Sequence, residues 1–115
     1  MAEVTVYHNP RCSKSREALR RLEELGVPHD VVLYLENPPD ESTLRQIVAK
    51  LEDPVRDLVR TQDARKRGIQ LGDLDDADHV IELLTSHPEV MQRPLVVTPD
   101  RAFVARPTDR VDTLA

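Results

Sequence analysis

Two β-rich segments, one at each end of the chain, limit the folds open to it more than any other feature. Near the N-terminus, Glu3 to Tyr7 alternates apolar with polar residues, as a strand does, and Val31 to Leu35 is continuously apolar. Such a continuous run is expected of a parallel strand covered on both faces. Between the two runs, apolar residues recur at helical spacing from Ala18 to Leu25, and Gly26 predicts the end of that helix. The N-terminal third therefore predicts a β-α-β unit.

The C-terminal segment has the pattern of a β-hairpin followed by a short helix. Leu95 to Thr98 and Ala102 to Ala105 are apolar runs separated by a turn at Pro99 and Asp100. Thr108 is suited to cap the helix that follows.

The middle of the chain is predicted to be mainly helical. Asp40 and Asp53 each stand where they could cap a helix, and either Asp75 or Asp76 could open a later one. The segment Thr61 to Gly72 is charged and punctuated by glycine, so it is predicted to be a loop.

This order of elements resembles a thioredoxin-like domain. We expect an α/β fold of the form βαβ…ββα, with a helical insertion over roughly residues 38–90 between the two halves. A chain of 115 residues fits one domain, 1–115, because single domains most often have ~100 to 150 residues. With one Phe, two Tyr and no Trp, the core has to be built from aliphatic side chains.

Charge and cysteine content exclude several classes of protein. The net charge of −5 gives no general attraction to nucleic acid or anionic lipid, and no apolar run approaches the ~18 residues of a membrane span. The N-terminus does not resemble a signal peptide, and one cysteine cannot form an intrachain disulfide. We expect a cytoplasmic protein without nucleic-acid or membrane partners, a metal site or a bound cofactor.

The one cysteine, Cys12, lies where the first strand gives way to the first helix. A free cysteine is often buried and inert, but Arg11, Ser13 and Lys14 surround this one with polar and positive groups. A helix N-terminus also offers unpaired N–H groups that favour a thiolate. Cys12 is therefore predicted to be a reactive nucleophile.

Two neighbours of Cys12 each have two possible roles. His8 could stabilise the thiolate as an imidazolium, or it could fix the loop by hydrogen bonding to backbone carbonyls. Ser15 could donate a hydrogen bond to the thiolate or help to cap the helix. Because Ser15 stands where a Cys-x-x-Cys motif has its second cysteine, an oxidised Cys12 has to be resolved by an external thiol.

Three arginines lie at the ends of predicted elements. Arg60 follows the apolar pair Leu58-Val59, Arg93 precedes the first hairpin strand, and Arg106 follows the second. In thioredoxin-like folds, the position of Arg93-Pro94 belongs to a cis-proline loop that faces the active-site cysteine. Each of these arginines alone could be a solvated surface charge, so a functional role for Arg60, Arg93 and Arg106 depends on their converging in space.

The chain resembles the glutaredoxin-like ArsC-type arsenate reductases from Thr5 to about Val111. The resemblance rests on a set of motifs in the order of that family: His8-Asn9-Pro10-x-Cys12-x-x-Ser15-Arg16, Tyr34-Leu35-Glu36-Asn37-Pro38-Pro39, Leu58-Val59-Arg60, His87-Pro88, Arg93-Pro94-Leu95-Val96-Val97-Thr98-Pro99 and Arg106-Pro107.

The resemblance implies an oxidoreductase of arsenical resistance that reduces arsenate to arsenite. In that reading Cys12 is the nucleophile, and Arg60, Arg93 and Arg106 bind arsenate. Glutathione, or another low-molecular-weight thiol, is the implied co-substrate, with a glutaredoxin-like thiol donor as partner.

Three alternatives remain open at this stage. Spx-type regulators, which bind RNA polymerase, share the fold, but many of them use a Cys-x-x-Cys switch that Ser15 removes. A thiol-dependent reductase of another substrate would need Cys12 without all three arginines. A structural or interaction module would leave the polar setting of Cys12 unexplained.

Overall fold

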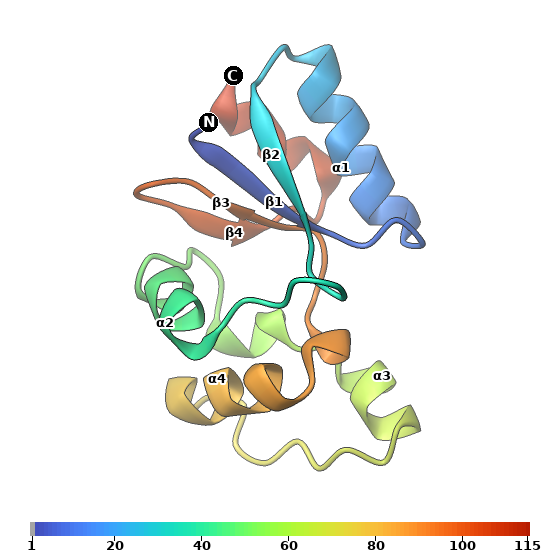
Figure 1. The fold of residues 1–115 in the computed structure, drawn as a ribbon, viewed down its shortest axis with the longest axis vertical. Coiled ribbons are helices and arrows are strands. Elements are labelled where there is room, and N and C mark those ends of the chain that lie inside the picture. Colours follow the sequence, from blue (N-terminus) through green and yellow to red (C-terminus); the bar gives the residue numbers. More distant parts are fainter. Residues whose placement is uncertain (1) are drawn as a thin grey trace.

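A computed structural model describes residues 2–115 of the chain, and Figure 1 shows its arrangement. The elements are β1 (Val4–His8), α1 (Ser13–Glu24), β2 (His29–Leu33), α2 (Glu41–Ala49), the 3₁₀ helix η1 (Val55–Leu58), α3 (Thr61–Lys66), α4 (Ala77–Ser86), the 3₁₀ helix η2 (Pro88–Val90), β3 (Leu95–Val97), β4 (Ala102–Val104) and the 3₁₀ helix η3 (Thr108–Leu114). No helix in this described part of the chain is long and apolar enough to cross a bilayer.

The four strands form one sheet in the order β2-β1-β3-β4. β1 and β2 are parallel, with Val6 opposite Val31, and α1 connects them. β3 pairs antiparallel with both β1 and β4. The predicted β-α-β unit and hairpin are therefore both confirmed, and they share one sheet through the β1–β3 pair.

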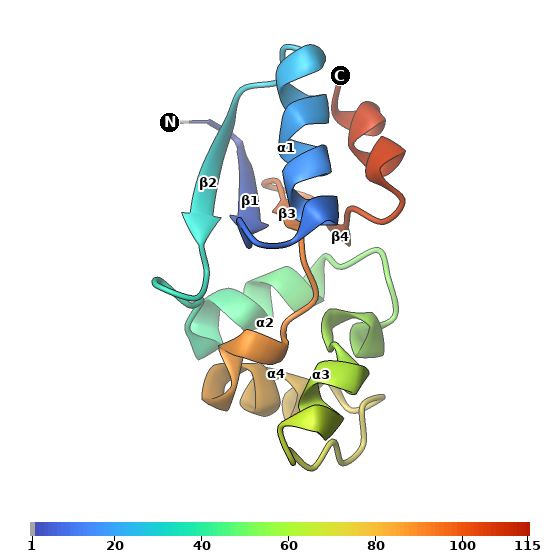
Figure 2. The same ribbon diagram turned by 90° about the vertical axis from the view of Figure 1, so that its right-hand side faces the viewer.

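Helical segments pack on both sides of the sheet. Figure 2 shows α1 and the C-terminal η3 together on one face. The core on that side is aliphatic apart from Phe103, and its buried residues are Val4, Val6, Ala18, Leu22, Val96, Phe103, Ala105 and Val111. The other face meets the helices between β2 and β3, where residues such as Leu44, Leu84 and Leu95 are buried. The predicted α/β architecture with a helical insertion is confirmed.

Local signals set the ends of several helices as predicted. Gly26 has φ +68°, a conformation that glycine adopts without steric cost, and α1 ends just before it. The carboxylate of Asp40 accepts a hydrogen bond from Thr43 N at 2.8 Å and caps α2. Of the two candidates for opening α4, Asp76 takes the cap position.

The expectation that Val31 to Leu35 is a strand covered on both faces is wrong. β2 ends at Leu33, and Val31 and Leu35 are 44% and 51% exposed. β2 is one of the two edge strands of the sheet, and unlike β4, whose residues are all buried, it is only partly covered by the helices packed against the sheet. Tyr34, which follows the strand, is the fully buried residue of this segment.

Three other local expectations are also wrong. Residues 61–66 form α3 instead of a loop, because the fully buried Ala64 packs this turn onto the core. Asp53 does not cap η1, since its carboxylate accepts from Val104 N at 2.9 Å. Thr108 does not cap η3, and its hydroxyl instead lies 3.3 Å from Glu17 Oε2.

Candidate active site

The turn between β1 and α1 places Cys12 at the start of the helix. Cys12 N donates to Asn9 O at 3.0 Å, and Arg11 N donates to the Asn9 side chain at 3.0 Å, so a tight turn follows the strand. Cys12 then takes the N-cap position of α1 with an extended backbone, φ −94° and ψ 121°. The thiol is half-buried.

Polar groups at this position favour the thiolate of Cys12. Burial alone raises the pKa of the thiol. The backbone N–H groups of Ser15 and Lys14, together with the hydrogen-bonding and charged guanidinium of Arg93, outweigh that effect and leave the pKa of Cys12 lowered. The predicted electropositive setting of the sulfur is thus present in the fold.

Two of the predicted arginines meet at the sulfur. Arg106 Nη2 lies 3.5 Å from Cys12 Sγ, and Arg106 Nε donates to Arg93 O at 2.9 Å. The Arg93-Pro94 peptide bond is cis, as the thioredoxin-like pattern predicts, and Arg106-Pro107 is cis as well. The loop before β3 and the segment after β4 therefore bring Arg93 and Arg106 together beside Cys12.

His8 and Ser15 form a buried pair behind the turn. His8 Nδ1 lies 2.6 Å from Ser15 Oγ, and the same hydroxyl accepts from Asn9 N at 3.1 Å. Burial, and secondarily the charge of Arg16, lower the pKa of His8, which disfavours the imidazolium role. The hydrogen bonds of this pair tie the end of β1 to the first turn of α1.

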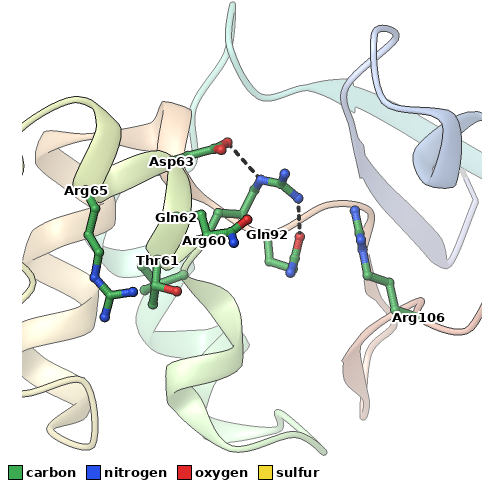
Figure 3. A pocket seen from close by; sticks show the side chains of 8 residues that line it. Arg60, Thr61, Gln62, Asp63, Arg65, Gln92 and Arg106 are labelled. Carbon is green, nitrogen blue, oxygen red and sulfur yellow. Dashed lines mark hydrogen bonds and ion pairs between the residues drawn. The ribbon is translucent and has the colours of Figure 1, made fainter.

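The third arginine, Arg60, is joined to Arg93 by two side chains. Arg60 Nε donates to Asp63 Oδ2 at 2.9 Å, and Arg93 Nη1 lies 3.5 Å from the same oxygen. Gln92 Oε1 accepts from Arg60 Nη1 at 3.0 Å and from Arg93 N at 3.2 Å. Figure 3 shows Arg60 held between Asp63 and Gln92.

Backbone pairing explains why these segments lie side by side. Arg60 N donates to Val90 O at 2.8 Å, and Gln92 N donates to Leu58 O at 2.7 Å. An isolated antiparallel bridge joins Val59 and Met91 between them. The segment after η1 and the segment after η2 thus run as a short ladder that places Arg60 next to Gln92.

An open pocket of ≈ 490 Å³ lies over this group. Its lining residues are Val59, Arg60, Thr61, Gln62, Asp63, Arg65, Gln92 and Arg106. Arg106, which enters from the side opposite Arg65 in Figure 3, connects the pocket with Cys12 through its contact with the sulfur. The pocket therefore combines guanidinium donors with an adjacent thiol.

One donor at this site has no partner within the described structure. Arg93 Nε is buried and makes no hydrogen bond, although its side chain is close enough to Cys12 to lower the pKa of the thiol. A buried unpaired donor is costly, and a ligand oxygen could satisfy it. Over residues 2–115 no group of three or more His, Cys, Asp or Glu side chains could hold a metal ion.

Comparison with known proteins assigns the chain to a family. The model of the ArsC family matches residues 7–114, a range that includes Cys12 and all three arginines. The chain belongs to the ArsC family. The predicted family resemblance is confirmed.

Relatives within the ArsC family span the whole domain. The chain is 40% identical to YfgD, an uncharacterized protein of Escherichia coli K12, over 95% of its own length and 93% of that protein. It is 38% identical to an arsenate reductase of Neisseria meningitidis serogroup A, over 99% of each chain. A solved structure of an arsenate reductase from Vibrio cholerae is 34% identical, covers both chains fully and superposes with a TM-score of 0.85.

Sequence reasoning missed two residues of this ArsC site, Asp63 and Gln92. Asp63 lies in a segment predicted to be a loop, and its spacing of three from Arg60 predicts a contact only if the segment is helical. Gln92 directly precedes Arg93, but its side chain faces Arg60 because of the backbone pairing with Leu58. The spacing of Arg60 and Asp63 is the one signal that could have revealed the first of them.

Proposed function

We propose that this protein is an arsenate reductase, an oxidoreductase that converts arsenate to arsenite with electrons from external thiols. The observation that carries the proposal is the position of Cys12 Sγ, 3.5 Å from Arg106 Nη2 and beside the guanidinium of Arg93. Relatives of matching length with the name arsenate reductase support the same activity.

The arginines suit a tetrahedral oxyanion. Arsenate carries negative charge at neutral pH, and planar guanidinium groups bind such oxygens through paired, charge-assisted hydrogen bonds. Arg93 and Arg106 lie beside the sulfur, and Asp63 links Arg60 to Arg93. In the proposed complex these groups hold the oxygens and offset charge that would otherwise repel the incoming thiolate.

The reaction can be written with balanced atoms and electrons. Cys12 thiolate attacks As(V), so that an S–As bond forms and one As–O bond breaks, and the oxygen leaves as water after protonation. An external thiolate then attacks the Cys12 sulfur, a disulfide bond forms, and arsenic departs with the S–As electron pair as arsenite. A second external thiol reduces this mixed disulfide and regenerates Cys12. Two thiols become one disulfide as As(V) gains two electrons.

The second thiol has to come from outside the domain. Cys12 is the one cysteine of the chain, and Ser15 is buried against His8 in the first turn of α1. We propose glutathione as the attacking thiol and a glutaredoxin-like protein as the partner that removes the mixed disulfide. A thiol that has to be returned to its free form suits the reducing cytoplasm, where we place the activity.

Arsenite formation tests the proposal directly. The purified protein is supplied with arsenate and with either glutathione plus glutaredoxin or another low-molecular-weight thiol, and arsenite is measured over time. We expect turnover by the wild type with at least one donor and none by Cys12→Ser, which keeps the shape of the site. Equal arsenite formation by Cys12→Ser would contradict the proposal, as would inactivity of the wild type with every donor.

A further inference from the structure

Asp63 contacts two of the three arginines of the site through one oxygen. Its Oδ2 lies 2.9 Å from Arg60 Nε and 3.5 Å from Arg93 Nη1. The Asp63 side chain is 29% exposed and that of Arg93 only 15%, so solvent screens these contacts less than it screens a surface ion pair. The carboxylate therefore links guanidinium groups from two segments far apart in sequence.

The contacts to Asp63 leave most guanidinium donors free. Arg60 uses Nε for Asp63 and Nη1 for Gln92, whereas a guanidinium has five N–H groups in all. Nε is the nitrogen next to the aliphatic stem, so the outer edge of Arg60 keeps unused donors. In Arg93, Nη1 faces Asp63 while Nε stays buried and unpaired. Asp63 thus orients both arginines without occupying all their donors.

Asp63 also changes the charge of the pocket. The hydrogen bond from Arg60, reinforced by the charges of Arg60 and Arg93, lowers the pKa of Asp63, so the carboxylate is ionised at neutral pH. Three guanidinium groups therefore share the site with one carboxylate. Without that carboxylate, like charges would repel one another and the positive field at Cys12 would strengthen.

We propose that Asp63 is a positioning residue of the oxyanion pocket, whose carboxylate fixes Arg60 and Arg93 in the orientation that receives a tetrahedral oxyanion and offsets part of their charge. The identity of the oxyanion rests on the proposed function, whereas the effect of Asp63 on the arginines and on Cys12 does not. Asp63 itself acts through the arginines and touches no reacting atom.

Two measurements on Asp63→Asn test this role. The first is the pH midpoint of Cys12 alkylation by iodoacetamide, which reports the thiolate without any substrate. Removing one negative charge beside Arg93 is expected to lower that midpoint by about half a pH unit. The second is arsenite formation, in which kcat is expected to fall about tenfold while KM for arsenate stays level or falls. General loosening of the fold would raise KM and would not make the thiol more acidic.

Two further variants separate charge from position. Asp63→Glu keeps the charge but moves the carboxylate by one methylene, so the alkylation midpoint should stay at the wild-type value while kcat falls. Asp75→Asn is the matched control, because it removes the same charge from the exposed Arg56–Asp75 pair, and it should change neither quantity.

The inference is overturned if Asp63→Asn leaves the alkylation midpoint unchanged or raises it. It is also overturned if Asp63→Asn reduces arsenate with the wild-type kcat. If the wild type reduces no arsenate with any donor, the proposed function fails, and the alkylation midpoint alone then decides the role of Asp63. Thermal melting of each variant verifies that the fold is intact.

Discussion

At the Cys12 sulfur, burial and positive charge act in opposite directions. Partial burial favours the neutral thiol, while the N–H groups of the first helical turn and the guanidinium of Arg93 favour the thiolate. The second effect is larger, so the pKa of Cys12 is lowered. The nucleophile is thus prepared by groups that also suit the binding of an oxyanion.

Arg93→Ala is expected to make Cys12 less acidic. The substitution removes a hydrogen-bond donor and a positive charge beside the sulfur while burial still raises the pKa of the thiol. The pH midpoint of Cys12 alkylation should therefore rise toward the ordinary cysteine value of about 8.5. Arg65→Ala, which alters an exposed residue of the pocket lining, is the control and should leave the midpoint in place. An unchanged midpoint in Arg93→Ala would show that Arg93 does not lower the pKa of Cys12.

His8 is expected to make the protein less stable in mild acid. Burial, followed by the charge of Arg16, lowers the pKa of His8 in the folded state, so the unfolded chain binds this proton more readily. The contribution to stability is present above the unfolded pKa of about 6.5 and is lost as the pH falls toward the lower folded pKa. Urea unfolding of the wild type across this range should show the decrease.

His8→Asn is the comparison for this pH effect. Asparagine can still hydrogen bond to Ser15 but does not titrate. Just below the unfolded histidine pKa of about 6.5, the free energy of unfolding of His8→Asn should therefore depend less on pH than that of the wild type. The same slope in both proteins would show that His8 is not the group responsible.

Among the secondary-structure elements, those with local signals could be predicted and those set by distant contacts could not. The end of α1 at Gly26 and the cap of α2 by Asp40 depend on residues within one turn. α3 depends on burial of Ala64 against side chains far along the chain, which a charged, glycine-punctuated sequence conceals. The edge position of β2 depends on the strand order, which its apolar run does not encode.

Asp53 joins the helical part of the chain to the sheet. Its Oδ2 accepts from Val104 N at 2.9 Å in β4, and its Oδ1 accepts from Arg110 Nη1 at 2.7 Å in η3. Arg110 in turn lies over the Phe103 ring, with 5.2 Å between its guanidinium carbon and the ring centroid. The Asp53 carboxylate thus accepts one hydrogen bond from the backbone of the edge strand β4 and another from Arg110 of η3, and so connects the two elements.

Asp53→Ala is expected to destabilise the fold by about 1 to 3 kcal/mol, because the buried N–H of Val104 loses its acceptor. Denaturant unfolding measures the change. Asp75→Ala, which breaks an exposed ion pair, is the control and should change stability little. Equal effects of the two substitutions would mean that Asp53 contributes only as a surface charge.

Over the whole molecule, the site is assembled from four separate segments. Cys12 and its helix position are local, and the sequence predicts them. The link between Arg60 and Arg93 depends on Asp63 and on the backbone pairing of residues 58–60 with 90–92, and no sequence pattern reveals that pairing. The sequence therefore indicates the three arginines, but only the structure shows that Asp63 and Gln92 hold Arg60 and Arg93 together.

Arsenite production by Arg106→Ala, measured beside Arg45→Ala, tests the central claim most directly. Arg106 lines the pocket and contacts the Cys12 sulfur, whereas Arg45 forms an exposed ion pair with Asp78 and does not line the pocket. We expect Arg106→Ala to lose about 2 to 4 kcal/mol of transition-state stabilisation, seen as a fall in kcat/KM of about 30-fold to 10³-fold. Arg45→Ala should retain wild-type activity. Wild-type activity in Arg106→Ala would contradict the account of a thiolate and guanidinium site for arsenate.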